Sequence, residues 1–114
     1  MSADAADAVT DLVRGLTAKH ERLGVTMDVS VDEHEISLDS IDRDRKDDGT
    51  RGRGADAIRD LCALADEHGL RMETSYMTCE PELGPYYARF GFLPHVVEGG
   101  YPHLLTMRRP ARPR

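Results

Sequence analysis

The chain has 114 residues and a formal net charge of -6, with 39% hydrophobic residues, 32% charged residues and no tryptophan. This length suits one compact domain with a modest core and is too short for two independent cores. The acidic balance argues against general nucleic-acid binding, because neutralising phosphates needs a basic surface. No window reaches the roughly 18 to 20 apolar residues of a membrane span, and Met1 to Asp11 has no apolar signal core, so we expect a cytoplasmic protein that does not bind membranes.

The segment from about Ala3 to Leu23 has the pattern of an amphipathic helix that ends at Gly24. Its apolar residues recur at helical spacing and predict a buried stripe of Val9, Leu12, Val13, Leu16 and Leu23. Strand alternation follows from Val25 to Val31, with a turn at Asp32-Glu33 and a second strand from His34 to about Ile41. These two strands are predicted to pair as a hairpin.

The alternation of the second strand slips by one residue at Asp39-Ser40, because its apolar positions are Ile36, Leu38 and Ile41. A β-bulge explains the slip and would bend the strand while leaving a backbone N–H free for a ligand. The simpler alternative is that the strand ends at Ser40. The sequence favours neither of the two.

After a charged stretch comes the Gly-rich turn Gly49-Thr50-Arg51-Gly52-Arg53-Gly54, which opens a helix that runs to about His68. The helix should bury Ile58, Leu61, Cys62 and Ala65. The remaining chain predicts a strand over Leu70 to Met77, a short helix from Pro81 to Phe90, and a hairpin whose arms are Phe92 to Val97 and His103 to Met107. The Arg- and Pro-rich end, Arg108 to Arg114, reads as a loose tail, with residues 1–109 taken as the single domain and 110–114 as tail.

Two cysteines, Cys62 and Cys79, form no C-x-x-C pair and no metal-ligand spacing with the five histidines. We expect both to be reduced and structural, and we expect no metal site.

A Gly-rich turn at the start of a helix presents unpaired backbone N–H groups to an anion, and Arg51, Arg53 and Arg59 add charge-assisted donors. The alternative is a flexible turn with solvated arginines. A Walker loop is excluded because no Lys-Ser or Lys-Thr follows the glycines. A dinucleotide-binding fold is excluded because its first glycine directly follows a buried strand, whereas a charged stretch intervenes here.

The Gly-rich turn, its helix, the next strand and Tyr86-Tyr87-Ala88-Arg89-Phe90-Gly91-Phe92 together resemble the GNAT superfamily of N-acetyltransferases over roughly Ile36 to Met107. The resemblance implies an α/β fold with a mixed, mostly antiparallel sheet flanked by helices in the order α-β-β-α-β-α-β-β. It also implies transfer of an acetyl group from acetyl-CoA to a primary amine, carried by a small molecule or a protein.

By the same resemblance, residues of the Gly-rich turn would hold the pyrophosphate of acetyl-CoA: Thr50, Arg51, Gly52, Arg53, Gly54 and Ala55. Ile41 and its neighbours would hydrogen-bond the pantetheine and the acetyl carbonyl. Tyr87 matches the family tyrosine near the sulfur, where a phenol can protonate the leaving thiolate; its alternative role is packing beside Phe90 and Phe92.

A general base is also useful, because the attacking amine must be deprotonated. Asp39 is the first candidate for this base and Glu35 the second, and His95 or His103 could relay protons. The segment before the first strand is one helix, where the family usually has a strand and two helices. That shortened acceptor side is compatible with a macromolecular substrate, a homodimer that completes the site, or a catalytically inactive CoA-binding or protein-interaction module. A binding protein with no CoA site is the third alternative.

Overall fold

The computed structural model describes residues 3–32, 34–43, 53–97, 99–100 and 102–111. Within them the elements follow the predicted order. They are α1 (Ala3–Arg22), β1 (Val25–Val31), β2 (Glu35–Arg43), α2 (Arg53–Glu67), β3 (Arg71–Met77), α3 (Leu83–Ala88), β4 (Leu93–His95) and β5 (Leu104–Arg109).

The strands of the described chain form one five-stranded sheet in the order β1-β2-β3-β5-β4. Three neighbouring pairs are antiparallel, and only β2 and β3 are parallel. The parallel pair is joined by α2, because parallel neighbours need a long crossover connection. The predicted mixed, mostly antiparallel α/β fold is therefore confirmed.

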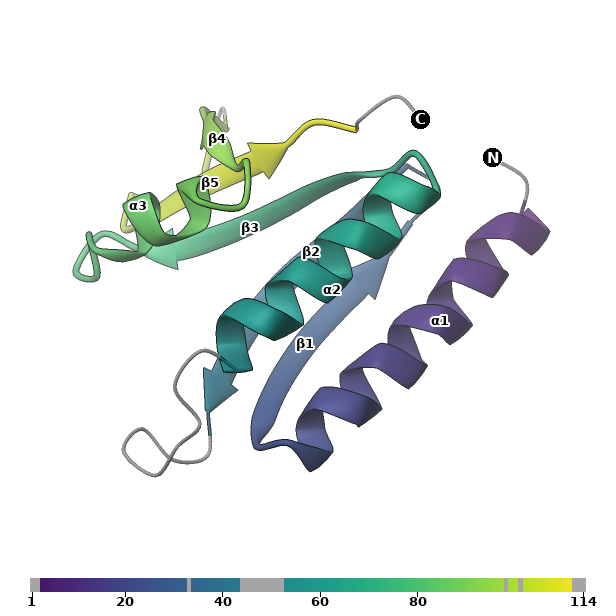
Figure 1. The fold of residues 1–114 in the computed structure, drawn as a ribbon. Helices are drawn as coiled ribbons and strands as arrows, with labels where there is room; N and C mark the ends of the chain where they lie inside the picture. Colours follow the sequence, from purple (N-terminus) through teal and green to yellow (C-terminus); the bar gives the residue numbers. More distant parts are fainter. Residues whose placement is uncertain (1–2, 33, 44–52, 98, 101, 112–114) are drawn as a thin grey trace.

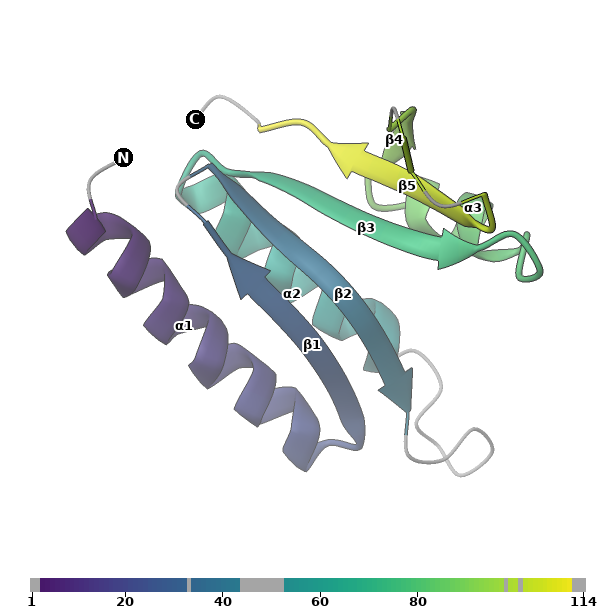
Figure 2. The same ribbon diagram turned by 180° about the vertical axis from the view of Figure 1, so that it is seen from behind.

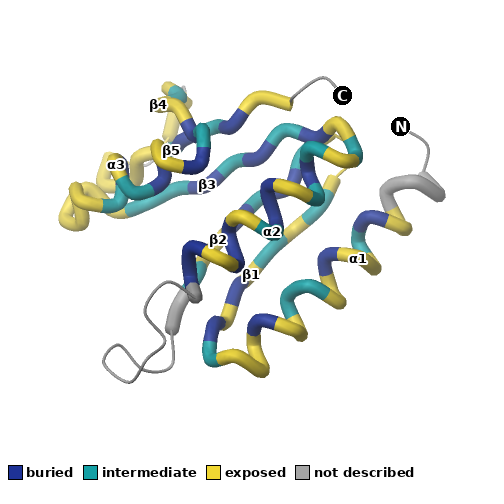
Figure 3. Tube along the Cα trace, viewed as in Figure 1, coloured by how far each residue is buried: buried dark blue, intermediate teal, exposed yellow. Residues whose placement is uncertain are grey.

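The three described helices lie on one face of the sheet, and the opposite face is uncovered (Figures 1 and 2). Figure 3 shows that buried positions recur along α2 and along the central strands. The largest fully buried side chains form one core between these layers: Val9, Val25, Ile36, Leu38, Ile58, Leu61, Leu70, Met72 and Phe92. In the described chain, no helix combines the length and the apolar composition that crossing a membrane requires.

The buried stripe of α1 differs from the prediction. Val9 and Val13 are buried as expected, but Leu12 is 49% exposed and Leu23 is 42% exposed, and His20 is buried at 2%. Helix α1 lies at the edge of the helical layer and packs on β1 and α2. Only the narrow stripe that faces these two elements is therefore covered, and its flanks remain in water.

The other helices follow the sequence more closely. All four residues predicted for the buried stripe of α2 are buried. The short helix begins later and ends earlier than predicted, and Gly91 after it has a φ of 95°, a conformation that glycine adopts without strain. Cys62 is buried, Cys79 is exposed, and both are free.

The end of the chain corrects the predicted tail. Arg108 and Arg109 belong to β5, and Arg109 is only 3% exposed. Its guanidinium donates to both carboxylate oxygens of Asp66, at 2.7 and 2.9 Å, and its Nε donates to the carbonyl of Phe90 at 2.8 Å. These bonds hold the last strand against α2, so Arg108 and Arg109 are part of the folded sheet and not of a loose tail.

Candidate functional site

The parallel strands β2 and β3 part halfway along their length. Their pairing runs from Glu35 opposite Arg71 to Leu38 opposite Thr74, and no further rung joins them. Beyond that rung β2 pairs only with β1, and β3 pairs only with β5. Figures 1 and 2 show the two strands diverging toward their C-terminal ends. The facing edges of the diverging halves therefore keep backbone N–H and C=O groups without a strand partner.

A β-bulge lies next to the last rung. Val29 pairs with Leu38 and Asp28 pairs with Ser40, so Asp39 is an extra residue with no partner on β1. The bulge alternative is confirmed, and the alternative that the strand ends at Ser40 is wrong, since β2 continues to Arg43. Because a bulge bends its strand, it accounts for the direction in which β2 leaves β3.

The side chain of Asp39 lies on the uncovered face of the sheet. It is exposed, and it accepts hydrogen bonds from the hydroxyls of Ser37 at 2.8 Å and Ser30 at 3.0 Å. Leu38, directly before it, points into the core. The exposed Asp39 carboxylate accepts these two hydrogen bonds from serine hydroxyls and has further lone pairs, which can accept a hydrogen bond from an incoming cation or amine.

Tyr87 of α3 approaches the same rung from the helical face. It is 4% exposed, and its ring packs against Tyr86, Phe92 and Tyr76 at centroid distances of 5.5, 5.9 and 6.4 Å. Burial raises the pKa of the Tyr87 phenol above its usual value, although a hydrogen bond with Thr74 opposes the rise. The phenol is therefore neutral at physiological pH and retains its proton for donation.

Thr74 connects these parts, and reasoning from the sequence missed it. Its hydroxyl donates to the carbonyl of Leu38 at 3.0 Å, and it also hydrogen-bonds with Tyr87. The signal in the sequence was a polar residue on the buried face of a strand, since Met72 and Thr74 alternate on that face. A buried hydroxyl requires hydrogen-bond partners. Those of Thr74 are the backbone carbonyl of Leu38 on β2 and the phenol of Tyr87 on α3.

The Gly-rich turn is described only in part. Thr50, Arg51 and Gly52 lie outside the described residues, whereas Arg53 is the first residue of α2. Gly54 and Ala55 are buried in its first turn. The helix begins at the end of the sheet where β2 finishes (Figure 1). Its N-terminus therefore lies at the same end as the parted strand edges.

Two of the candidate residues, Glu35 and His95, lie away from this rung. Glu35 lies at the start of β2, where its carboxylate is 3.5 Å from Arg71 and 3.7 Å from Arg108. His95 belongs to β4 and lines a separate cavity. Three candidates converge instead on the rung where the strands part, namely Asp39, Tyr87 and the backbone of β2 through Ile41.

The sequence matches no family model and none of the curated proteins. Among solved structures, the fold is similar to the crystal structure of nourseothricin acetyltransferase, with a TM-score of 0.61 and 17% sequence identity. The similarity covers 78% of this chain and 58% of that chain, so this chain spans less than two thirds of that enzyme. The likeness establishes an acetyltransferase-like fold for this chain.

Proposed function

We propose that the chain is a GNAT-type N-acetyltransferase that moves the acetyl group of acetyl-CoA to a primary amine. The observation that carries the proposal is the end of β2–β3 pairing at Leu38 and Thr74, beside the bulge at Asp39. An extended amide-containing substrate arm can pair with such a free strand edge through its own N–H and C=O groups. The start of α2 at the same end supplies backbone N–H groups for phosphate oxygens.

The chemistry is a direct transfer. The amine nitrogen attacks the thioester carbonyl carbon, and Asp39 accepts the amine proton directly or through one water molecule. The C–S bond then breaks, and the leaving thiolate takes the phenol proton of Tyr87. Asp39 and Tyr87 lie on opposite faces of the sheet, so base and acid would approach the reacting carbon from opposite sides.

The test begins with binding. Acetyl-CoA at millimolar concentration should raise the midpoint of thermal unfolding, because a ligand that binds only the folded state stabilises it. An unchanged midpoint contradicts the proposal. After a positive result, release of free thiol from acetyl-CoA in the presence of an amine panel measures transfer.

A CoA-binding module without turnover is the second candidate. It is favoured by the burial of Tyr87 within the aromatic cluster, which a purely structural tyrosine would share. A raised unfolding midpoint with no thiol release from any amine in the panel would identify this alternative.

A further inference from the structure

A second cavity opens at the opposite end of the sheet from the proposed acetyl-CoA site. It has a volume of about 960 Å³ and is bounded by the residues before β2, after α2, and along β3, β4 and β5. The proposed acetyl-CoA site lies instead at the end of β2 and the start of α2. Two sites at opposite ends of the sheet can be occupied independently.

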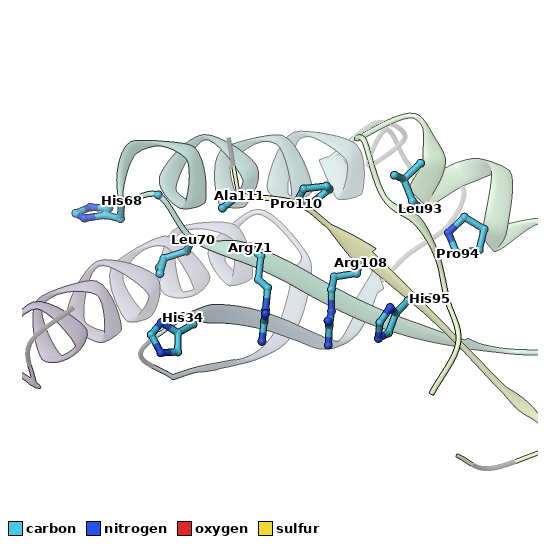
Figure 4. A pocket seen from close by; sticks show the side chains of 11 residues that line it. His34, His68, Leu70, Arg71, Leu93, Pro94, His95, Arg108, Pro110 and Ala111 are labelled. Carbon is cyan, nitrogen blue, oxygen red and sulfur yellow. The ribbon is translucent and has the colours of Figure 1, made fainter. Parts of the chain in front are cut away.

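Every ionisable side chain that lines this cavity is a cation or can become one. They are His34, His68, Arg71, His95 and Arg108. Figure 4 shows four of them, His34, Arg71, Arg108 and His95, in a row that points the same way from neighbouring strands and their ends. This grouping of basic side chains occurs in a chain whose net charge is -6.

The two arginines are incompletely hydrogen-bonded. The Nε atoms of Arg71 and Arg108 both face the same oxygen of Glu35, at 3.5 and 3.7 Å. These distances exceed those of good hydrogen bonds, and all three atoms are buried without a hydrogen-bond partner. Arg108 also donates to Glu73 at 3.0 Å. The side chains of Arg71 and Arg108 are 43% and 32% exposed, so an anion in the cavity can approach the outer part of each guanidinium.

Two carboxylates offset the charge of the arginines. Glu35 and Glu73 flank Arg71 and Arg108, so the four charges balance. Burial, and then the charge of Glu73, raises the pKa of Glu35 although both arginines oppose the rise, so Glu35 holds its negative charge less firmly than an ordinary glutamate and opposes a bound anion less.

The rest of the lining is apolar. Leu70, Leu93, Pro94 and Pro110 contribute to the wall, and Leu93 is 58% exposed. A wall of this kind contacts the body of an organic molecule rather than a hydrated inorganic ion.

We propose that this cavity binds an organic anion, with its carboxylate or phosphate group on the histidines and arginines and its apolar body on the leucine and proline wall. The proposal is independent of the acetyl-CoA site.

The five histidines make the test direct, because three line the cavity while His20 and His103 lie outside it. The ring resonances of the protein are followed by NMR during titration with benzoate, phenyl phosphate and the neutral benzyl alcohol. Benzoate and phenyl phosphate should shift the rings of His34, His68 and His95 saturably. Benzyl alcohol should shift none of them. Equal shifts at His20 or His103, or no saturation, would overturn the proposal.

Variants then separate this cavity from any other anion site. Arg71→Gln should weaken benzoate binding roughly tenfold, the loss of one charge-assisted hydrogen bond. Arg14→Gln, exposed on α1 and outside the cavity lining, should leave binding unchanged.

The part played by the histidines is tested with a triple variant. His34→Gln, His68→Gln and His95→Gln together should weaken benzoate binding, because they remove the ring N–H donors that line the cavity, whereas His103→Gln should retain it. These histidines are exposed or half-buried, so the substitutions leave no buried charge unpaired. Amide spectra that match the wild type outside the cavity establish the fold of each variant. Unchanged benzoate affinity in the triple variant contradicts the proposal.

Discussion

Asp39 and Tyr87 owe their positions to two different local features. Asp39 follows a core-facing residue on a strand, so alternation turns it to the uncovered face, where two serine hydroxyls hold it. Tyr87 lies on a helix whose approach to the sheet is close: a Cβ added at Gly84 would stand 2.6 Å from the Tyr76 hydroxyl. A glycine at that position allows α3 to bring the phenol near the last rung.

Replacing Tyr87 with phenylalanine tests the acid role. We expect kcat for acetyl transfer to fall by about 10²-fold, the usual worth of a positioned acid, with little change in the KM for acetyl-CoA. Because burial raises the pKa of Tyr87, any loss of kcat from phenol ionisation should begin at a higher pH than for an ordinary tyrosine. Tyr86→Phe, on the same helix, is the matched control. Unchanged turnover in Tyr87→Phe would leave Tyr87 as a packing residue.

Replacing Asp39 with asparagine tests the base. The amide oxygen can still accept from a serine hydroxyl, so the free energy of unfolding should change by less than about 0.5 kcal/mol, as for exposed sites. The value of kcat/KM at neutral pH should fall by about 10²-fold. Asp28→Asn, an exposed aspartate on the neighbouring strand, should retain full activity. Equal losses in both variants would indicate a general charge effect instead of proton transfer.

Among the elements, α1 and α2 are linked by one carboxylate. Asp60 of α2 lies 2.8 Å from the Nε2 of buried His20 and 3.2 Å from the Nζ of Lys19. Burial acts to raise the pKa of Asp60, but the hydrogen bonds with His20 and Lys19 outweigh it and lower the pKa below its usual value. A carboxylate whose pKa is lower in the folded state than in the unfolded state stabilises the fold. The stabilisation is fully present at a pH above the unfolded-state pKa, which is about 4, and it is lost as the pH falls through the folded-state pKa.

Asp60→Asn should therefore lower the free energy of unfolding at pH 7 by about 1 kcal/mol or less, because the side chain of Asp60 is 42% exposed and solvent screens the pair. The difference from the wild type should shrink toward pH 3. Asp11→Asn, which removes an exposed pair within α1, is the control. Urea unfolding at both pH values measures the effect, and a difference that is constant with pH would contradict the linkage.

The start of α2 can be tested with two glycines. Gly54 is buried in the first turn of α2, whereas Gly15 is exposed in α1 with open space where a Cβ would stand. Gly54→Leu should abolish the rise of the unfolding midpoint caused by acetyl-CoA. Gly15→Leu should keep the rise and gain up to about 1 kcal/mol of helix propensity. An acetyl-CoA response that survives in folded Gly54→Leu would remove the Gly-rich turn from the binding site.

On the scale of the whole molecule, Arg109 connects β5 with Asp66 of α2 and with the carbonyl of Phe90, just after α3. Hydrogen bonding with Asp66 raises the pKa of Arg109, so the pair stays charged although Arg109 is buried. Arg109→Gln should destabilise the fold by about 3 to 5 kcal/mol, since it leaves the Asp66 carboxylate without its main partner. The double variant Arg109→Met/Asp66→Ala should recover part of this loss. Denaturant midpoints check both, with Arg14→Gln as the exposed control.

Periodicity predicted much of the fold because it is a local property. The order of elements and the buried stripe of α2 can be recognised from the spacing of apolar residues along one segment. The slip in that spacing at Asp39-Ser40 left a bulge and a strand end equally open, and only the pairing with β1 decided for the bulge. The stripe of α1 was predicted incorrectly at Leu12 and Leu23, because their burial depends on which neighbours cover the flanks of the helix. The Arg-rich end was misjudged for a related reason, as the partner of Arg109 lies on α2.

The candidate site likewise combines features that are visible in the sequence with features that only the fold creates. The sequence by itself proposed which residues bind phosphate or carry a proton, namely those of the Gly-rich turn, Asp39 and Tyr87, and these roles stay predictions. Only the tertiary structure decided that β2 and β3 part at Leu38 and Thr74, that Asp39 and Tyr87 lie on opposite faces of the sheet, and that five basic side chains share one cavity. Spacing reports on neighbours along the chain, whereas these features join segments up to 74 positions apart, from His34 to Arg108.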